Sequence, residues 1–173
     1  MIKAVIFDFA GVIGTDGYWI WLKKNVSDLE SKKAYYQKIS EQVDRAEISN
    51  SEFVKAISKE SGIPEDKIWL EIYEEIVINN ELLGLIKELK KKYKIGLLSN
   101  FTYPWLHQVL TNYNLYSYFD QVIISSEHKV IKPEPEIFHK MLKILNVVED
   151  EVIFIDDRQV NIDVANKLEI KGI

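Results

Sequence analysis

Four short apolar runs limit the architectures open to this 173-residue chain, because none of them alternates strictly between apolar and polar residues. Such runs are typical of parallel strands, whose two faces are both covered by helices. Helical stretches separate the last three runs, as right-handed βαβ units require. The predicted strands are residues 3–8, 94–100, 121–125 and 151–157.

Each of the three later strands follows a segment with apolar residues at helical spacing. These predicted helices are residues 81–93, 104–113 and 134–146. Alternating strands and helices favour an α/β fold with a doubly wound, Rossmann-like parallel sheet. The last five residues, "EIKGI", look like the entry into a fifth strand.

The segment between the first and second strands is much longer than a single crossover helix needs. It is polar, amphipathic and mostly helical in its spacing, so we predict an inserted helical cap. The expected core is residues 1–14 and 82–173, and the expected cap is residues 15–81. The helix signals within it are N-caps at Ser31 and at Ser49 or Asn50, and a stop at Gly62.

Composition excludes several classes of function. A net charge of -5 argues against a general nucleic-acid binder, which usually carries a basic face. No apolar stretch is long enough to span a bilayer, and Asp8 interrupts the N-terminal run too early for a signal peptide. The absence of Cys fits a reducing compartment. We therefore expect a cytoplasmic monomer or homodimer that binds neither nucleic acid nor membrane.

Polar side chains follow all four predicted strands, where ligands bind in a parallel doubly wound sheet. Carboxylates that converge there repel one another unless a cation lies between them, and hard oxygen ligands suit Mg²⁺. A Lys and a Ser hydroxyl nearby would hold phosphate oxygens, and a carboxylate facing the phosphate can attack phosphorus. The candidate residues are Asp8, Ser99, Asn100, Lys132, Asp156 and Asp157.

This constellation resembles the haloacid dehalogenase superfamily of hydrolases over almost the whole chain. Its four motifs appear in order as "DFAGVI", "LLSN", "IKPEPEIF" and "FIDDRQVNI". The pattern is most similar to the branch that contains the soluble epoxide hydrolase N-terminal phosphatase and bacterial sugar-phosphate phosphatases. The segment "RAEISNSEFVKAI" resembles the cap of that branch. The resemblance implies a Mg²⁺-dependent phosphatase of a small phosphorylated metabolite.

The resemblance also implies a role for each matching residue. Asp8 would be the nucleophile, and Lys132 would neutralise charge on the nucleophile and on the phosphate. Ser99, Asn100 and Lys132 would bind the transferring phosphoryl group. The Mg²⁺ ligands would be Asp8, the backbone oxygen of Ala10, Asp156 and Asp157, with Asn161 orienting their loop.

Ala10 departs from the family pattern, which has a second Asp at this position. In the family's phosphatases that Asp protonates the leaving oxygen and then activates water, and Ala can do neither. General acid–base catalysis is typically worth about 10²- to 10⁴-fold. We therefore expect slow turnover, with the smallest loss for leaving groups that need no proton.

Two other functions remain open from the sequence. Ala10 also fits a catalytically impaired phosphate-binding or interaction protein. A metal-independent 2-haloacid dehalogenase likewise lacks the second Asp, but the pair Asp156 and Asp157 would repel its carboxylate substrate. His128 is a candidate substitute acid or base, and Lys129 a candidate anion-binding cation. Aromatic residues at 18–21 and 101–105 either pack in the core or form an apolar wall above the nucleophile.

Overall fold

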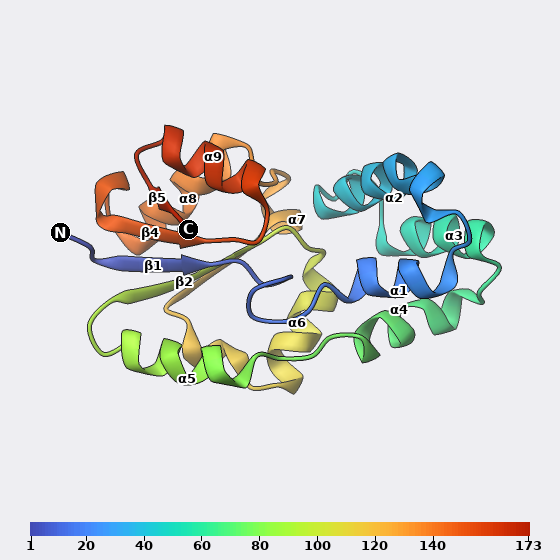
Figure 1. The fold of residues 1–173 in the computed structure, drawn as a ribbon, viewed down its shortest axis with the longest axis horizontal. Coiled ribbons are helices and arrows are strands. Elements are labelled where there is room, and N and C mark those ends of the chain that lie inside the picture. The colour runs from blue at the N-terminus through green and yellow to red at the C-terminus, as the bar shows by residue number, and fades with distance from the viewer.

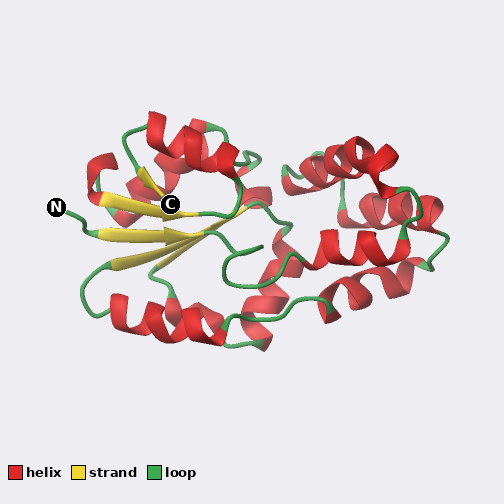
Figure 2. Cartoon of the chain, in the orientation of Figure 1, coloured by secondary structure: helices red, strands yellow, loops and turns green.

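The computed structural model describes residues 1–173 and contains a five-stranded parallel sheet with the order β3-β2-β1-β4-β5 (Figures 1 and 2). The predicted strands are confirmed to within two residues at each end, and the predicted fifth strand pairs with β4. The strands are β1 (Ala4–Phe7), β2 (Lys94–Ser99), β3 (Gln121–Ile124), β4 (Val152–Ile155) and β5 (Lys171–Gly172).

Helices cover both faces of the sheet, which confirms the doubly wound α/β fold (Figure 1). On one face, α5 and α6 pack over the central strands through residues such as Ile86 and Leu106. On the other face, α8 and α9 pack through residues such as Met141 and Ala165. The helices of this part are α5 (Asn80–Leu89), α6 (Tyr103–Asn112), α7 (Ser125–His128), α8 (Pro135–Leu145) and α9 (Gln159–Lys167), with 3₁₀ turns η1 (Leu115–Tyr118) and η2 (Glu149–Glu151).

Four further helices lie beyond the carboxyl ends of the strands (Figure 2). They surround an apolar cluster of their own, with ten buried residues that include Trp21, Tyr36 and Phe53. Burial of this cluster supplies the main stabilisation that each amphipathic helix lacks by itself. The helices are α1 (Gly17–Asn25), α2 (Leu29–Asp44), α3 (Asn50–Ser61) and α4 (Glu65–Glu74).

The predicted helix signals in this region are confirmed in two cases and wrong in one. Ser49 caps α3 in a capping box with Glu52, and Gly62 ends that helix with a φ of 74°. Ser31 is not an N-cap, because α2 already begins at Leu29. Its hydroxyl instead donates to the carboxylate of Asp28 at 2.6 Å.

Polar contacts fasten these helices to the sheet edge. The Thr102 hydroxyl donates to the side-chain oxygen of Asn50 at 2.5 Å. The Ser125 hydroxyl donates to the backbone oxygen of Asp44 at 2.7 Å. The stacked rings of Trp69 and Trp105, with centroids 4.3 Å apart, join α4 to α6. The helices are therefore held directly over the carboxyl ends of the strands.

None of the helices combines the length and the apolar composition that crossing a bilayer requires.

Candidate active site

The pairing of two central strands brings the candidate carboxylates together. Phe7 of β1 is in register with Ile155 of β4, so the residues that follow them lie side by side. The backbone N–H of Asp8 donates to the carbonyl of Ile155 at 2.9 Å. As a result, Asp8, Asp156 and Asp157 each offer a carboxylate oxygen, and these oxygens all lie within 4.8 Å of one another.

The two carboxylate oxygens of Asp8 have different surroundings. Its Oδ1 accepts from the backbone N–H of Phe9 at 2.6 Å and is paired with Lys132 Nζ at 2.8 Å. These contacts fix the carboxylate and leave Oδ2 without a partner. Burial raises the pKa of Asp8 to about 7, although the ammonium of Lys132 opposes this shift. One oxygen is thus held in place while the other can accept a metal or attack a substrate.

Lys132 is the buried cation between two carboxylates. It is 2% exposed, and its Nζ lies 2.8 Å from Asp8 and 2.7 Å from Asp156. Asn100 fixes the backbone of Lys132 from both sides, because its Nδ2 donates to the carbonyl at 2.8 Å and its Oδ1 accepts from the N–H at 2.7 Å. Asn100 and Lys132 are both predicted to bind the phosphoryl group, and these two hydrogen bonds hold them together.

Replacing Lys132 with Met should lower the free energy of unfolding by about 3–5 kcal/mol, because two buried carboxylates lose their cation. Urea unfolding at pH 7 measures this change. Lys55→Met, which removes an exposed lysine on α3, serves as the control and should change stability by less than about 0.5 kcal/mol. Equal stability of Lys132→Met and the parent protein would show that Lys132 does not compensate this charge.

Asp156 and Asp157 differ in how far their oxygens are already used. The carboxylate of Asp156 accepts from Lys132 Nζ at 2.7 Å, from the backbone N–H of Arg158 at 2.9 Å and from Asn161 Nδ2 at 2.8 Å. Asp157 is exposed and forms no ion pair with a basic side chain. Burial and the neighbouring charge of Asp156 raise its pKa. Asp157 consequently has its oxygens free for a cation, whereas Asp156 mainly orders its neighbours.

A tight turn after β1 places Ala10 and Gly11 beside these carboxylates. The N–H of Gly11 donates to the carbonyl of Gly14 at 2.7 Å, which folds the turn back on itself. Gly11 has a φ of +81°, and a Cβ at this position would lie 2.4 Å from Asp157 Oδ2. Only glycine satisfies both the backbone conformation and the close approach of Asp157.

We expect Gly11→Ala to weaken Mg²⁺ binding by about tenfold or more, because the added methyl group displaces Asp157. Isothermal titration with MgCl₂ measures the affinity. The matched control is Gly62→Ala, where φ is +74° but nothing lies within 4 Å of the new Cβ. Both variants should lose about 1 kcal/mol of stability from backbone strain. Unchanged Mg²⁺ affinity in Gly11→Ala alone would contradict a role of Asp157 as a ligand.

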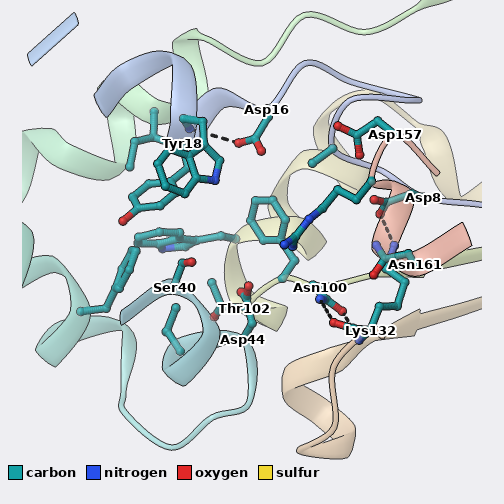
Figure 3. Close-up of a pocket in the computed structure, with 18 residues that line it drawn as sticks. Asp8, Asp16, Tyr18, Ser40, Asp44, Asn100, Thr102, Lys132, Asp157 and Asn161 are labelled. Carbon is teal, nitrogen blue, oxygen red and sulfur yellow. Dashed lines mark hydrogen bonds and ion pairs between the residues drawn. The ribbon is translucent and has the colours of Figure 1, made fainter. Parts of the chain in front are cut away.

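A cavity opens above this cluster (Figure 3) and has an empty volume of about 770 Å³, including its mouth. Most predicted site residues line it: Asp8, Ala10, Asn100, Lys132, Asp157 and Asn161. Asp156 lies behind them and is 7% exposed. Ser99 is fully buried outside the lining, and its hydroxyl has no hydrogen-bond partner. His128 and Lys129 are exposed and do not line the cavity.

Three charged residues of the cavity lining escaped the sequence analysis. Asp16 caps α1, Asp44 ends α2, and Arg158 follows the acidic pair. Asp16 and Asp44 belong to the inserted helices, where no motif marks a functional position. The aromatic residues at 18–21 and 101–105 were the available signal, since several of them line the cavity while also packing against the apolar clusters.

The donor set fits a divalent cation. Three carboxylate oxygens converge within 4.8 Å, and Lys132 is the one basic side chain paired with them. The free oxygens of Asp8 and Asp157 are hard donors of the kind Mg²⁺ prefers, usually together with water and substrate oxygens. The residues present can therefore hold Mg²⁺ without any rearrangement of the fold.

Comparison with known proteins agrees with this geometry. A family model described as haloacid dehalogenase-like hydrolase matches residues 2–168. D-ribitol-5-phosphate phosphatase of Bacteroides thetaiotaomicron is 29% identical and covers 97% of this chain and 89% of its own length. A phosphorylated carbohydrates phosphatase of Thermotoga maritima is 25% identical over 99% of this chain and 83% of its own length.

A solved structure matches over the full chain. It is an aspartate-to-alanine mutant of a haloacid dehalogenase family enzyme from Bacteroides thetaiotaomicron, in complex with magnesium and inorganic phosphate. The TM-score is 0.81 and the identity 26%, over 100% of this chain and 93% of that one. The chain described here thus belongs to the haloacid dehalogenase-like hydrolases.

Proposed function

We propose that this protein is a Mg²⁺-dependent phosphatase of a small phosphorylated metabolite. The observation that carries the proposal is the Asp8 carboxylate, which has one oxygen fixed by Lys132 and the other free beside Asp157. The relatives named above are phosphatases of phosphorylated sugars and polyols, and a related enzyme binds magnesium together with phosphate.

In the proposed reaction the free oxygen of Asp8 attacks phosphorus, and the bond from phosphorus to the ester oxygen breaks. The products of this step are an aspartyl-phosphate and the departing alcohol or alkoxide. Water then cleaves the acyl phosphate, releases inorganic phosphate and regenerates Asp8. Lys132 neutralises charge on the nucleophile and on the phosphate, and Asn100 keeps it in position.

The proposed Mg²⁺ ligands are the Asp8 oxygen that does not attack phosphorus, the backbone oxygen of Ala10 and Asp157. Asp156 would orient Lys132 and the loop of Asn161, because its oxygens already accept from both. When bound, the ion supplies charge neutralisation for the phosphate oxygens. Ser99 does not line the cavity, so its predicted part in phosphate binding would require its buried, unpaired hydroxyl to become accessible to the phosphate.

We further propose that residues 15–81 act as the cap of this active site. Tyr18 of α1, Asp44 of α2 and Phe53 of α3 all line the cavity. A lining supplied by α1–α3 would exclude water and contact the leaving group, while the sheet edge holds the phosphate.

Removal of the metal tests the proposed function. With 4-nitrophenyl phosphate and 5 mM MgCl₂, we expect steady release of nitrophenolate, which does not need protonation to depart. Excess EDTA should lower the rate by about 100-fold or more, and added Mg²⁺ should restore it. Activity that persists after chelation would overturn the proposal. Phosphate binding without turnover of any ester would instead support the catalytically impaired alternative that Ala10 suggests.

A further inference from the structure

The part of the cavity farthest from the nucleophile has a chemistry of its own. In Figure 3, Asp8, Lys132 and Asp157 lie at one end and Tyr18 lies toward the other, with Asp16 and Asp44 between them on opposite sides of the view. In the proposed reaction the first end holds the phosphate. The second end, here called the leaving-group half, must therefore accept the alcohol part of the ester.

Aromatic rings form a continuous wall in the leaving-group half. The centroids of Tyr18 and Trp19 are 5.7 Å apart, and those of Tyr18 and Phe53 are 5.5 Å apart. Phe53 in turn lies 5.8 Å from Trp105. The stacking of Trp105 on Trp69, at 4.3 Å, fixes the far end of this wall. Aromatic faces attract cations through their quadrupole as well as excluding water.

Two carboxyl groups of the leaving-group half belong neither to the metal cluster nor to an ion pair. Asp16 accepts from the backbone N–H of Trp19 at 3.1 Å, and Asp44 has no hydrogen-bond donor to its carboxylate. Burial raises the pKa of both groups, that of Asp44 to about 8. Without a cation beside it, Asp44 is therefore largely protonated at pH 7, and a cation bound there would stabilise the ionised carboxylate.

The lining of the whole cavity also contains more acidic than basic side chains. Four of the lining side chains are carboxylates and two are basic. Lys132 is already paired with Asp8 and Asp156. Arg158 lowers the pKa of Asp16 and Asp44 by its charge, but burial outweighs this effect and no ion pair is formed. Mg²⁺ and a phosphate dianion would cancel each other, so the lining keeps two more carboxyl groups than basic groups, and a cationic ligand would favour their ionisation.

We infer that the leaving-group half takes an alcohol that carries a cationic nitrogen, held between the carboxylates of Asp16 and Asp44 and the aromatic wall. This substrate class rests on the proposed phosphatase function. An ammonium or quaternary ammonium group a few atoms from the ester oxygen would compensate both carboxylates. Its methyl or methylene groups would meet the faces of Tyr18 and Trp19.

Binding of the alcohol alone tests this inference without any turnover. Choline is titrated into the protein while tryptophan fluorescence is recorded, since Trp19 and Trp105 line the cavity. The matched probe is 3,3-dimethylbutan-1-ol, which has the same shape but no charge, in buffer with equal chloride. We expect choline to bind at least about tenfold more tightly. Equal binding of the two probes, or no binding of choline, would overturn the inference.

Variants locate the binding. Asp44→Asn and Asp16→Asn keep the side-chain shape and remove the charge, and each should weaken choline binding by about tenfold without changing the neutral probe. Asp66→Asn, on the exposed side of α4, is the control and should change neither. Choline binding that survives both Asn substitutions unchanged would overturn the assignment to this half of the cavity.

Hydrolysis adds a second readout. Phosphocholine should exceed 3,3-dimethylbutyl phosphate in kcat/KM by about tenfold or more, and Asp44→Asn should remove the preference. Equal rates for the two esters, or a preference for glycerol phosphate over both, would overturn the inference. If no ester is hydrolysed, the proposed phosphatase function fails, and the choline titration still decides the inference independently.

Discussion

Asp8→Asn is expected to lower kcat/KM for every phosphate ester by about 10⁴-fold or more, because an amide oxygen cannot form the covalent intermediate. The side chain keeps its size, so the contacts of Oδ1 with Phe9 and Lys132 need little change. Phosphate release from 4-nitrophenyl phosphate measures the loss. The protein concentration is set high enough for its rate to exceed that of the buffer blank.

The control for this substitution is Asp66→Asn, which removes an exposed carboxylate far from the cavity. It should retain full activity. Circular dichroism of Asp8→Asn should match that of the parent protein, which separates a loss of chemistry from a loss of folding. If Asp8→Asn retained more than about a hundredth of the parent rate, Asp8 would not be the nucleophile.

Ala10→Asp is expected to raise kcat for alkyl phosphates by about 10²- to 10⁴-fold, the usual worth of a general acid–base group. Ala10 lines the cavity and is only partly buried, so a carboxyl placed there can extend into the cavity. The gain should be small for 4-nitrophenyl phosphate, whose leaving group departs without a proton. The ratio of the two rates is therefore the quantity to measure.

Ala10→Asn separates proton transfer from a change of shape, because it is similar in size to Asp and carries no acid. It should leave the ratio of alkyl to aryl rates unchanged. A rise in that ratio with both substitutions would show that filling the cavity, and not proton transfer, limits the parent protein. No rise with Ala10→Asp would mean that another group already protonates the leaving oxygen.

The sheet and the positions of the site residues could be predicted because strand ends are marked in the sequence. Each apolar run ends at a polar residue, and the parallel arrangement of the strands places these polar residues at the same edge of the sheet. Asp8 and Asp156 thus become neighbours through the pairing of Phe7 with Ile155, and Lys132 reaches both of them.

The finer arrangement depends on contacts that residue patterns do not contain. The saturation of Asp156 by Lys132 and Asn161 follows from a loop conformation, not from spacing. Asp44 lines the cavity because α2 ends there, and no rule fixes that end. Ser31 is predicted to be an N-cap, but α2 already begins at Leu29. The residue before the helix is Asp28, which has a left-handed conformation with a φ of 54°.

The pairing of β1 with β4 sets the order in which this protein can become active. Asp8, the proposed nucleophile, lies near the start of the chain, whereas Asp156 and the proposed metal ligand Asp157 follow the fourth strand. During synthesis, β1 can pair with β2 first, but its second partner β4 exists only when nearly the whole chain has been made. Contacts so distant in sequence slow folding, since the loop between them must close first. A ribosome-bound fragment that ends before β4 therefore contains the proposed nucleophile but lacks Asp156 and Asp157.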